Sequence, residues 1–313
     1  MHILMLGRGV IATIYGQALQ AAGHSVEFYV RPGRAAEYGD HVRMDLIDAR
    51  STPLGRRVQR TVPTRLRESI DTGDGFDLVV VSVAHHQLRD AAALLAPRIG
   101  DATVLVLGNV WEEPLAALSP LPDTQVMFGF PLAGGSFDDD GVLHGALLGT
   151  IILGTAGTSP SSRELEVQTV FRQAGLRVRA ERNMTEWLWL HFVADVGMHA
   201  QGHRHGGLAN MIGDRRALRE AFLISRELLP LLLARGVDLR RHRGALMPYR
   251  LPGLTAAGMA WATTHIPIAG ASLAAHTDPD AAEPQAVLRD ALRDARRLGI
   301  PTPRLDAALA HSR

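Results

Sequence analysis

Residues 2–34 are HILMLGRGVIATIYGQALQAAGHSVEFYVRPGR, and this stretch decides the fold of the chain. Its hydrophobic pattern predicts a short buried strand over 3–6, a glycine turn, an amphipathic helix over 13–22 and a second strand over 25–30. A strand, a glycine turn, a helix and a strand within about thirty residues are typical of a dinucleotide-binding unit. We therefore expect an α/β domain of the Rossmann type, with a mostly parallel sheet, at the start of the chain.

The glycine turn has the spacing Gly-x-Gly-x-x-Ala. Gly7 permits the tight turn, Gly9 lets the backbone approach a pyrophosphate, and Ala12 keeps the helix close to the sheet. The first turn of the helix adds N–H donors and a partial positive charge. We expect the pyrophosphate of a dinucleotide to be bound by the residues of this turn, which are Gly7, Arg8, Gly9, Val10, Ile11 and Ala12.

The end of the second strand indicates which dinucleotide the unit binds. NAD sites carry an Asp or Glu there for the ribose 2′-hydroxyl, whereas this chain has Arg31 and then Arg34. Guanidinium groups bind a 2′-phosphate and have no acceptor for a hydroxyl. Arg8, inside the glycine turn, is able to join the same pocket. The alternative is that these arginines are solvated loop residues; we favour a site for NADPH.

The composition excludes several other classes of function. The 313 residues include 33 basic and 32 acidic side chains, so the net charge is +1 and no overall field favours nucleic acid or an anionic membrane. The chain has no cysteine, which excludes disulfides, thiolate metal sites and a cysteine nucleophile. We find no signal peptide and no apolar run of the roughly 18 residues that a membrane span needs. We expect a cytoplasmic protein.

The pattern after residue 34 extends the α/β domain. Residues 35–67 show weak alternation and are expected to form short strands and loops at an edge of the sheet. A continuous apolar run over 77–83 predicts a buried parallel strand. Further strands are expected over 103–107, 126–130, 143–153 and 176–180, with a glycine-rich loop over 131–136. Helices are expected over 86–95 and from the serines of 159–162 to residue 173.

From Met184 onward the pattern is helical. Helices are expected over 186–200, 215–235, 256–264 and 284–298, and loops over 202–207, 242–252 and 276–279. We therefore predict two domains with a boundary at 182–184. Residues 1–183 are expected to form the NADP-binding Rossmann domain, and residues 184–313 an all-helical domain for substrate binding and dimerisation.

Three polar side chains recur at four-residue spacing on the first helix of the second domain: His191, Asp195 and His199. They share one face of the helix, and His203 follows one turn later if the helix continues. On an otherwise apolar helix such groups need a partner, a ligand or water. The first interpretation is that they line an active site, in which His191 protonates the alkoxide as it forms. The second is that they are ordinary core and surface residues. The third is that they bind a metal, although the row spans about 12 Å of helix, too far for all of it to close on one ion.

Other polar positions lie where ligands bind. Asn109 follows the strand over 103–107, at the carboxyl edge where ligands bind in open α/β sheets. His85 and His86 follow the preceding strand, either as cofactor contacts or as a solvated pair. Glu283, at the start of the last long helix, is on its own an acidic residue favoured by the helix dipole. We find no motif of a serine hydrolase, a P-loop ATPase or a zinc protease.

These motifs together resemble the ketopantoate reductase family. The resemblance covers nearly the whole chain. It rests on the Gly-x-Gly-x-x-Ala turn with Arg31, on Asn109, on the tryptophan-rich start of the second domain, and on Glu283 with the ending LGIPTP at 298–303. It implies an NADPH-binding Rossmann domain followed by a helical domain of the 6-phosphogluconate-dehydrogenase-like type. It also implies reduction of a 2-oxo acid in the cleft between them.

The catalytic positions depart from the family pattern. The family has a Trp, then two residues later a catalytic Lys, and then Asn four and eight residues further along. Aligned on Trp189, this chain has His191 at the Lys, Asp195 at the first Asn and His199 at the second. A neutral imidazole is able to donate a proton but holds a carboxylate poorly. The departure therefore predicts a substrate other than ketopantoate.

Outside this helix, the resemblance implies further site residues. Ala84 stands where the family often carries a Lys near the cofactor, and Asn109 matches a residue of the family's active site. Glu283 matches a residue that positions the substrate. Both Ala84 and Asn109 are therefore expected in the cofactor site.

We predict an NADPH-dependent reductase of a carbonyl or imine substrate. His191 is the expected proton donor, and the substrate is positioned by Asp195, His199 and Glu283. One alternative is a non-redox enzyme or cofactor-binding protein that has lost the family's Lys and Asn residues. Another is a metal-assisted enzyme that uses the polar row. The expected partners are a small-molecule substrate and a second copy of the chain, bound through the helical domain; neither nucleic acid nor a membrane is expected.

Overall fold

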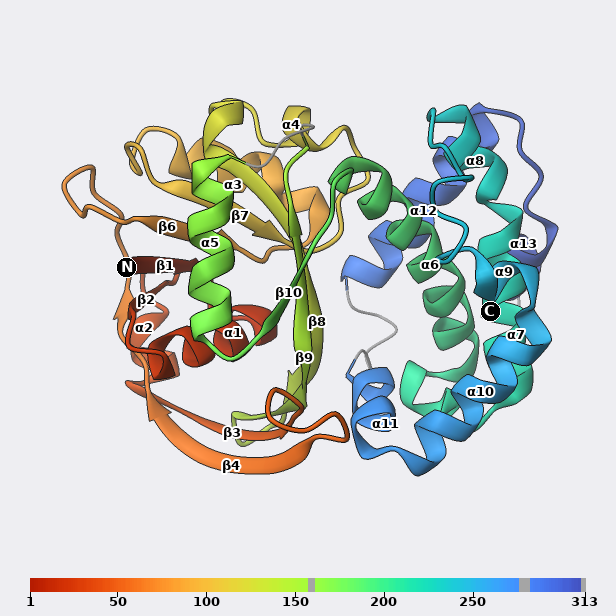
Figure 1. Ribbon diagram of the computed structural model, residues 1–313, viewed down its shortest axis with the longest axis horizontal. Helices are drawn as coiled ribbons and strands as arrows, with labels where there is room; N and C mark the ends of the chain where they lie inside the picture. The colour runs from red at the N-terminus through yellow and green to blue at the C-terminus, as the bar shows by residue number, and fades with distance from the viewer. Residues whose placement is uncertain (157–160, 276–281, 311–313) are drawn as a thin grey trace. The chain divides into compact units, whose positions relative to one another are not determined.

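The computed structural model describes residues 1–156, 161–275 and 282–310. The chain divides into two units, Met1–Thr185 and Glu186–Arg313, each with its own internal contacts (Figure 1). The first unit contains the whole sheet, and the described part of the second unit is helical. An α/β domain followed by an all-helical one is the fold class that the sequence predicted.

Within the described residues, the sheet has ten strands. They are β1 (His2–Leu6), β2 (Ser25–Tyr29), β3 (His41–Asp48), β4 (Arg56–Pro63), β5 (Leu66–Arg67), β6 (Leu78–Val81), β7 (Thr103–Leu107), β8 (Val126–Phe137), β9 (Val142–Gly154) and β10 (Arg177–Ala180). The central strands β6 and β7 are buried along their whole length, because helices cover both faces of a parallel sheet.

The strand order explains where a ligand binds. The strands β5-β2-β1-β6-β7-β8 lie side by side in this order, and every pair of neighbours in the series is parallel. This is the doubly wound dinucleotide-binding order, in which the strand order reverses between the first and the fourth strand. The reversal falls here between β1 and β6. Ligands bind at such a switch point, beyond the carboxyl ends of the strands.

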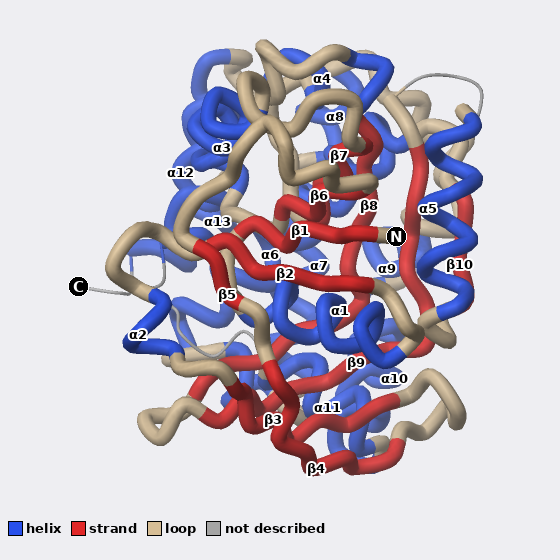
Figure 2. The backbone as a smooth tube through the Cα atoms, turned by 90° about the vertical axis from the view of Figure 1, so that its left-hand side faces the viewer, coloured by secondary structure: helices blue, strands red, loops and turns tan. Residues whose placement is uncertain are grey.

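The remaining strands continue the sheet beyond β8 (Figure 2). The strand β9 runs antiparallel to β8 and parallel to both β3 and β10, and β4 closes the edge beside β3. The short strands and loops expected within 35–67 therefore include two eight-residue strands. Their β3–β4 pair lies at one edge of the sheet, whereas β5 lies at the other.

The glycine-rich segment over 131–136 is not a loop, as the sequence analysis expected, but part of β8. Its Gly135 pairs with Gly145 of β9. A Cβ atom at Gly135 would lie 2.1 Å from the carbonyl oxygen of His144, so the two strands approach more closely than side chains permit. The glycines therefore allow a close pairing, which single-sequence reasoning took for a break in the strand.

Helices connect the strands of the first unit. They are α1 (Val10–Ala21), α2 (Ala35–Tyr38), the 3₁₀ turn η1 (His85–Gln87), α3 (Leu88–Leu95), α4 (Pro114–Ala117), the 3₁₀ turn η2 (Asp123–Gln125) and α5 (Ser162–Gln173). The α1 helix packs on the sheet through Tyr15, whose hydroxyl accepts a hydrogen bond from the backbone N–H of Leu132 at 3.1 Å. The Tyr15 ring also contacts Phe171 of α5. These contacts hold the start of α1 at the carboxyl edge of β1.

The second unit is built from α6 (Met184–His205), the 3₁₀ turn η3 (Leu208–Met211), α7 (Arg215–Glu227), α8 (Leu229–Ala234), α9 (Met247–Arg250), α10 (Pro252–His265), α11 (Pro267–Ala274), α12 (Ala282–Arg297) and α13 (Pro303–Ala310). No helix of the described chain has the length and apolarity that crossing a bilayer requires.

Three sequence expectations for this unit need correction. The loop expected from residue 202 begins later, because α6 continues to His205, with cationic side chains in its last turn that suit the helix dipole. The helix expected over 215–235 is divided at Leu228 into α7 and α8, next to Pro230, which has no N–H for the helix ladder. The loop expected over 242–252 contains α9. The loop expected over 276–279 lies outside the described residues.

The packing of α6 on α7 depends on one glycine. A Cβ at Gly197 would lie 2.1 Å from the backbone carbonyl oxygen of Ala221 and 2.3 Å from Ser225 Oγ. A carbonyl in the middle of α7 has little room to move. We expect Gly197→Ala to lower the free energy of unfolding by about 1–3 kcal/mol, as overpacking does. Chemical denaturation of the full chain measures the change.

Gly258 provides a matched control on α10. It is also in a helix of the second unit, but it is exposed, and a Cβ there would meet no heavy atom of the described residues within 4 Å apart from the backbone of its own helix. The same change should therefore stabilise the protein at Gly258 by about 0.5–1 kcal/mol, because alanine favours the helix over glycine. Stabilisation at both positions would show that α6 and α7 are not in close contact at Gly197.

Candidate functional site

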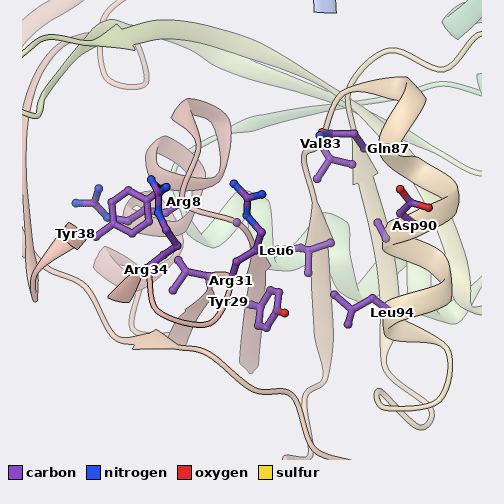
Figure 3. Close-up of a pocket in the computed structure, with 13 residues that line it drawn as sticks. Leu6, Arg8, Tyr29, Arg31, Arg34, Tyr38, Val83, Gln87, Asp90 and Leu94 are labelled. Carbon is purple, nitrogen blue, oxygen red and sulfur yellow. The ribbon is translucent and has the colours of Figure 1, made fainter. Parts of the chain in front are cut away.

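A cavity of about 400 Å³ lies at the carboxyl ends of β1, β2 and β6, where the strand order reverses (Figure 3). Its lining residues come from these strand ends and from the helices that follow them. They are Leu6, Gly7, Arg8, Tyr29, Val30, Arg31, Arg34, Tyr38, Val83, Gln87, Asp90, Ala91 and Leu94. The position is the one at which open α/β sheets bind their ligands.

The glycine turn forms one wall of this cavity. Gly7 has φ +95°, a left-handed conformation that side chains disfavour, and its N–H donates to the carbonyl oxygen of Tyr29 at 2.9 Å. Gly9 is the N-cap of α1, and a Cβ at either glycine would meet no heavy atom of the described residues within 4 Å, its chain neighbours aside. Space for a ligand therefore adjoins the start of a twelve-residue helix, whose first N–H groups suit a phosphate.

Cationic side chains gather on one side of the cavity. Figure 3 shows Arg8, Arg34 and Tyr38 grouped beside Arg31, across from the residues of α3. Arg31 is exposed and makes no side-chain hydrogen bond or ion pair within the described chain. Arg34 is half-buried and its Nε lies 2.9 Å from Glu37 Oε2. Burial lowers the pKa of Arg8.

The loop that carries Arg31 and Arg34 is held by the carboxylate of Glu68, which follows β5. Glu68 Oε1 accepts a hydrogen bond from the backbone N–H of Ala35 at 2.8 Å. The N–H groups of Ala35 and Gly33 lower the pKa of Glu68, because they stabilise its ionised form. Glu68 therefore stays ionised at neutral pH and fixes the turn after β2. Nothing in the local sequence pattern pointed to this residue.

The other predicted cofactor residues lie at the same edge of the sheet but outside this cavity's lining. Val10 and Gly9 line a second cavity of about 770 Å³ that adjoins the first at Arg8. Ile11 is half-buried, and Ala12 is fully buried between α1 and the sheet. Ala84 caps η1 after β6, and Asn109 is buried after β7. The structure thus brings Gly7, Arg8, Arg31 and Arg34 together in the cavity.

Sequence reasoning missed several residues of the cavity. Gln87 and Asp90 line it from η1 and α3, and Tyr38 lines it from α2. The sequence pattern that places His85 and His86 after a strand was the nearest indication, because Gln87 follows in the same turn. Tyr38 belongs to a segment without clear periodicity, so its place in the cavity became visible only in the folded chain.

The predicted polar row is found on α6 in the second unit. His191 Nε2 lies 3.4 Å from Asp195 Oδ1, and both side chains are partly exposed. The His191 ring stacks on Trp187, with ring centroids 5.0 Å apart and an interplanar angle of 9°. His199 is buried. The row therefore contains an oriented imidazole–carboxylate pair, held from one side by an aromatic ring.

A tyrosine adjoins this pair. Tyr249 of α9 is buried, and burial together with the charge of Asp195 raises its pKa. Glu283 lies in the first turn of α12 and is half-buried. In the described parts of the chain, no three His, Asp or Glu side chains are grouped so as to hold a metal ion.

Residues 3–157 match the family model "Ketopantoate reductase PanE/ApbA". No curated protein sequence matches the chain.

Solved structures match the fold over the full length. A 2-dehydropantoate 2-reductase from Geobacter metallireducens is 18% identical, with a TM-score of 0.69, covering 100% of this chain and 99% of that one. D-mandelate dehydrogenase with NADH and anilino(oxo)acetate is 14% identical, with a TM-score of 0.69 and coverage of 100% and 97%. A dimeric ketopantoate reductase from Staphylococcus aureus is 14% identical, with a TM-score of 0.60 and coverage of 100% and 99%.

Proposed function

Since the chain is a divergent member of the ketopantoate reductase family, we propose that it is an NADPH-dependent reductase of a carbonyl or imine substrate. The family relation supports an oxidoreductase. The observation that carries the choice of NADPH is the group of Arg8, Arg31 and Arg34 in the cavity beside the glycine turn. Three guanidiniums suit a 2′-phosphate, and this end of β2 has no carboxylate where an NAD site needs one.

The residues of the cavity fit the dinucleotide. The turn of Gly7 to Ala12 would hold the pyrophosphate, and Arg31 and Arg34 the 2′-phosphate, with Ala84 and Asn109 at the same edge of the sheet toward the nicotinamide. Bound NADPH would supply a hydride. The glycine conformation and the Glu68 contact set the backbone of this site before any ligand arrives.

On the proposed mechanism, His191 provides the proton that the reduced substrate needs. Its ring is held between the Trp187 stack and the Asp195 carboxylate at 3.4 Å, so its orientation is restricted. We propose that His191 acts as the imidazolium: its Nε2–H faces the Asp195 carboxylate, which orients the ring, and its Nδ1–H passes the proton to the substrate oxygen or nitrogen and leaves a neutral imidazole. His199 and Glu283 complete the proposed set as substrate-positioning residues.

Replacement of the family's Lys by His191 favours a different substrate from ketopantoate. A lysine ammonium binds a carboxylate directly, whereas Asp195 places a negative charge beside His191. A substrate without a carboxylate at that point, or an imine, suits the site better. We include a homodimer in the proposal, supported by the dimeric enzyme of Staphylococcus aureus with the same fold. A small-molecule substrate and a cytoplasmic location belong to the same proposal.

The proposal is tested by following NADPH oxidation with a panel of 2-oxo acids, ketones, aldehydes and imines. We expect NADPH to bind more tightly than NADH and at least one panel member to be reduced. Binding of NADPH without turnover on the panel would favour the second candidate, a non-redox enzyme or cofactor-binding protein. The observation behind that candidate is the loss of the family's Lys and both Asn residues from α6. Failure of both dinucleotides to bind would contradict the reductase and the cofactor-binding protein, and would favour a non-redox enzyme that has lost the cofactor site.

A further inference from the structure

We infer that Tyr38 is a positioning residue that sets the preference for a 2′-phosphorylated dinucleotide, by holding Arg8 and Arg34 beside Arg31. The inference rests on the proposed function, since it concerns the cofactor that the reductase uses. Tyr38 is the last residue of α2 and lines the cavity together with all three arginines (Figure 3).

The Tyr38 side chain contacts both of the other arginines that line the cavity, Arg8 and Arg34. The guanidinium carbon of Arg8 lies 4.9 Å from the centre of the ring, and that of Arg34 lies 5.3 Å from it. Arg34 Nη2 also donates a hydrogen bond to the Tyr38 hydroxyl at 3.3 Å. A cation over an aromatic face is attracted by the negative charge of the ring's π system. One ring therefore holds two like charges that would otherwise repel each other.

The two guanidiniums are also held from their outer sides. Arg34 pairs with Glu37, the neighbour of Tyr38 on α2. Arg8 Nη2 donates to the carbonyl oxygen of His41 at 3.2 Å, and its guanidinium carbon lies 5.7 Å from the centre of the Phe137 ring. These outer contacts remain when the Tyr38 ring is removed, and they draw the arginines away from Arg31.

Arg8 and Tyr38 line both the 400 Å³ cavity and the adjoining 770 Å³ cavity, so they form the partition between the two. Without the ring, Arg8 keeps its contacts with His41 and Phe137, which lie on the side of the larger cavity. Arg8 then swings out of reach of a phosphate bound near Arg31. Tyr38 acts through the guanidiniums. Its removal should therefore weaken the binding of a 2′-phosphate and leave the binding of the rest of the nucleotide unchanged.

The test compares two ligands that differ by one phosphate, adenosine 2′,5′-bisphosphate and 5′-AMP, by calorimetric titration of the full chain. Tyr38→Ala should weaken binding of the bisphosphate by about 10- to 30-fold and change 5′-AMP affinity by less than about 2-fold, since the ring attracts both cations. Tyr38→Phe keeps the ring and loses one hydrogen bond, so it should weaken bisphosphate binding by only about 3-fold. In turnover assays Tyr38→Ala should raise KM for NADPH and leave kcat unchanged.

Tyr29→Ala is the matched control. Tyr29 also lines the 400 Å³ cavity, but no guanidinium of the described chain is stacked on it. Tyr29→Ala should weaken the binding of both ligands by the same factor. If Tyr38→Ala lowers the affinity for both ligands by the same factor, or changes neither, the preference for the bisphosphate is unchanged and the inference is overturned. A wild-type protein that binds both ligands equally would instead contradict the proposed NADPH specificity, and the inference with it.

Discussion

Replacement of His191 by alanine is expected to lower kcat by about 10²- to 10⁴-fold, the range over which a positioned general acid contributes. The reason is that the proposed proton donor disappears while the cofactor cavity of the first unit is unchanged. The Kd for NADPH should therefore stay within about 2-fold of the wild-type value, whereas turnover of the substrate collapses. Stopped assays of NADPH oxidation and a separate binding titration measure the two effects.

The chain contains a control of nearly the same geometry. His265 on α10 also follows a tryptophan by four residues, and its ring stacks on Trp261 with centroids 5.3 Å apart. It is exposed and belongs to no proposed site. His265→Ala should leave kcat unchanged, so a general loss of the tryptophan–histidine stack cannot explain the effect at His191. Full activity of the His191 variant would remove the imidazole from the mechanism.

The second large effect is expected from Arg31. The Arg31→Ala variant should raise KM for NADPH by about 10- to 100-fold, because a hydrogen-bonded charge pair contributes about 1.5–3 kcal/mol and each 1.4 kcal/mol is tenfold in affinity. KM for NADH should change little, since that dinucleotide has no 2′-phosphate. Adding Arg34→Ala to the Arg31→Ala variant should reduce the preference for NADPH over NADH further. Steady-state kinetics with both dinucleotides gives the ratio directly.

Arg56 is the corresponding control. It is an exposed arginine at the start of β4, away from the cavity lining, so Arg56→Ala removes the same charge from the same unit. It should leave both KM values within about 2-fold of the wild type, because Arg56 belongs to the lining of neither cavity. Equal losses for NADPH and NADH in Arg31→Ala would place Arg31 against the adenosine in place of the 2′-phosphate.

The elements that line the 400 Å³ cavity were largely predictable from the chain alone. The strand expected over 103–107 is β7, with the same bounds, and the helix expected to end at residue 173 is α5. The βαβ unit over 2–30 is β1, α1 and β2. These segments were predictable because their hydrophobic pattern has the period of the structure they form, and because glycines mark their ends.

Elements whose form depends on a distant partner were predicted less well. Gly135 suggested a loop, and only its pairing with Gly145 shows that it belongs to a strand. The division of α7 from α8 and the presence of α9 likewise were not expected. Within the cavity, Arg31 and Arg34 were predicted from their place after β2, whereas Gln87, Asp90 and Tyr38 were not.

The sequence by itself determined the dinucleotide-type start of the chain, the change from strands to helices near Met184, and the His191–Asp195 row on one helix face. All of these follow from contacts between residues close together in the chain. Only the tertiary structure decided what surrounds the arginines, because Tyr38 of α2 and Phe137 of β8 reach Arg8 from distant segments, and Glu68, which follows β5, holds the turn that carries Arg34. Such contacts depend on strand register and close approach, which no local pattern of residues records.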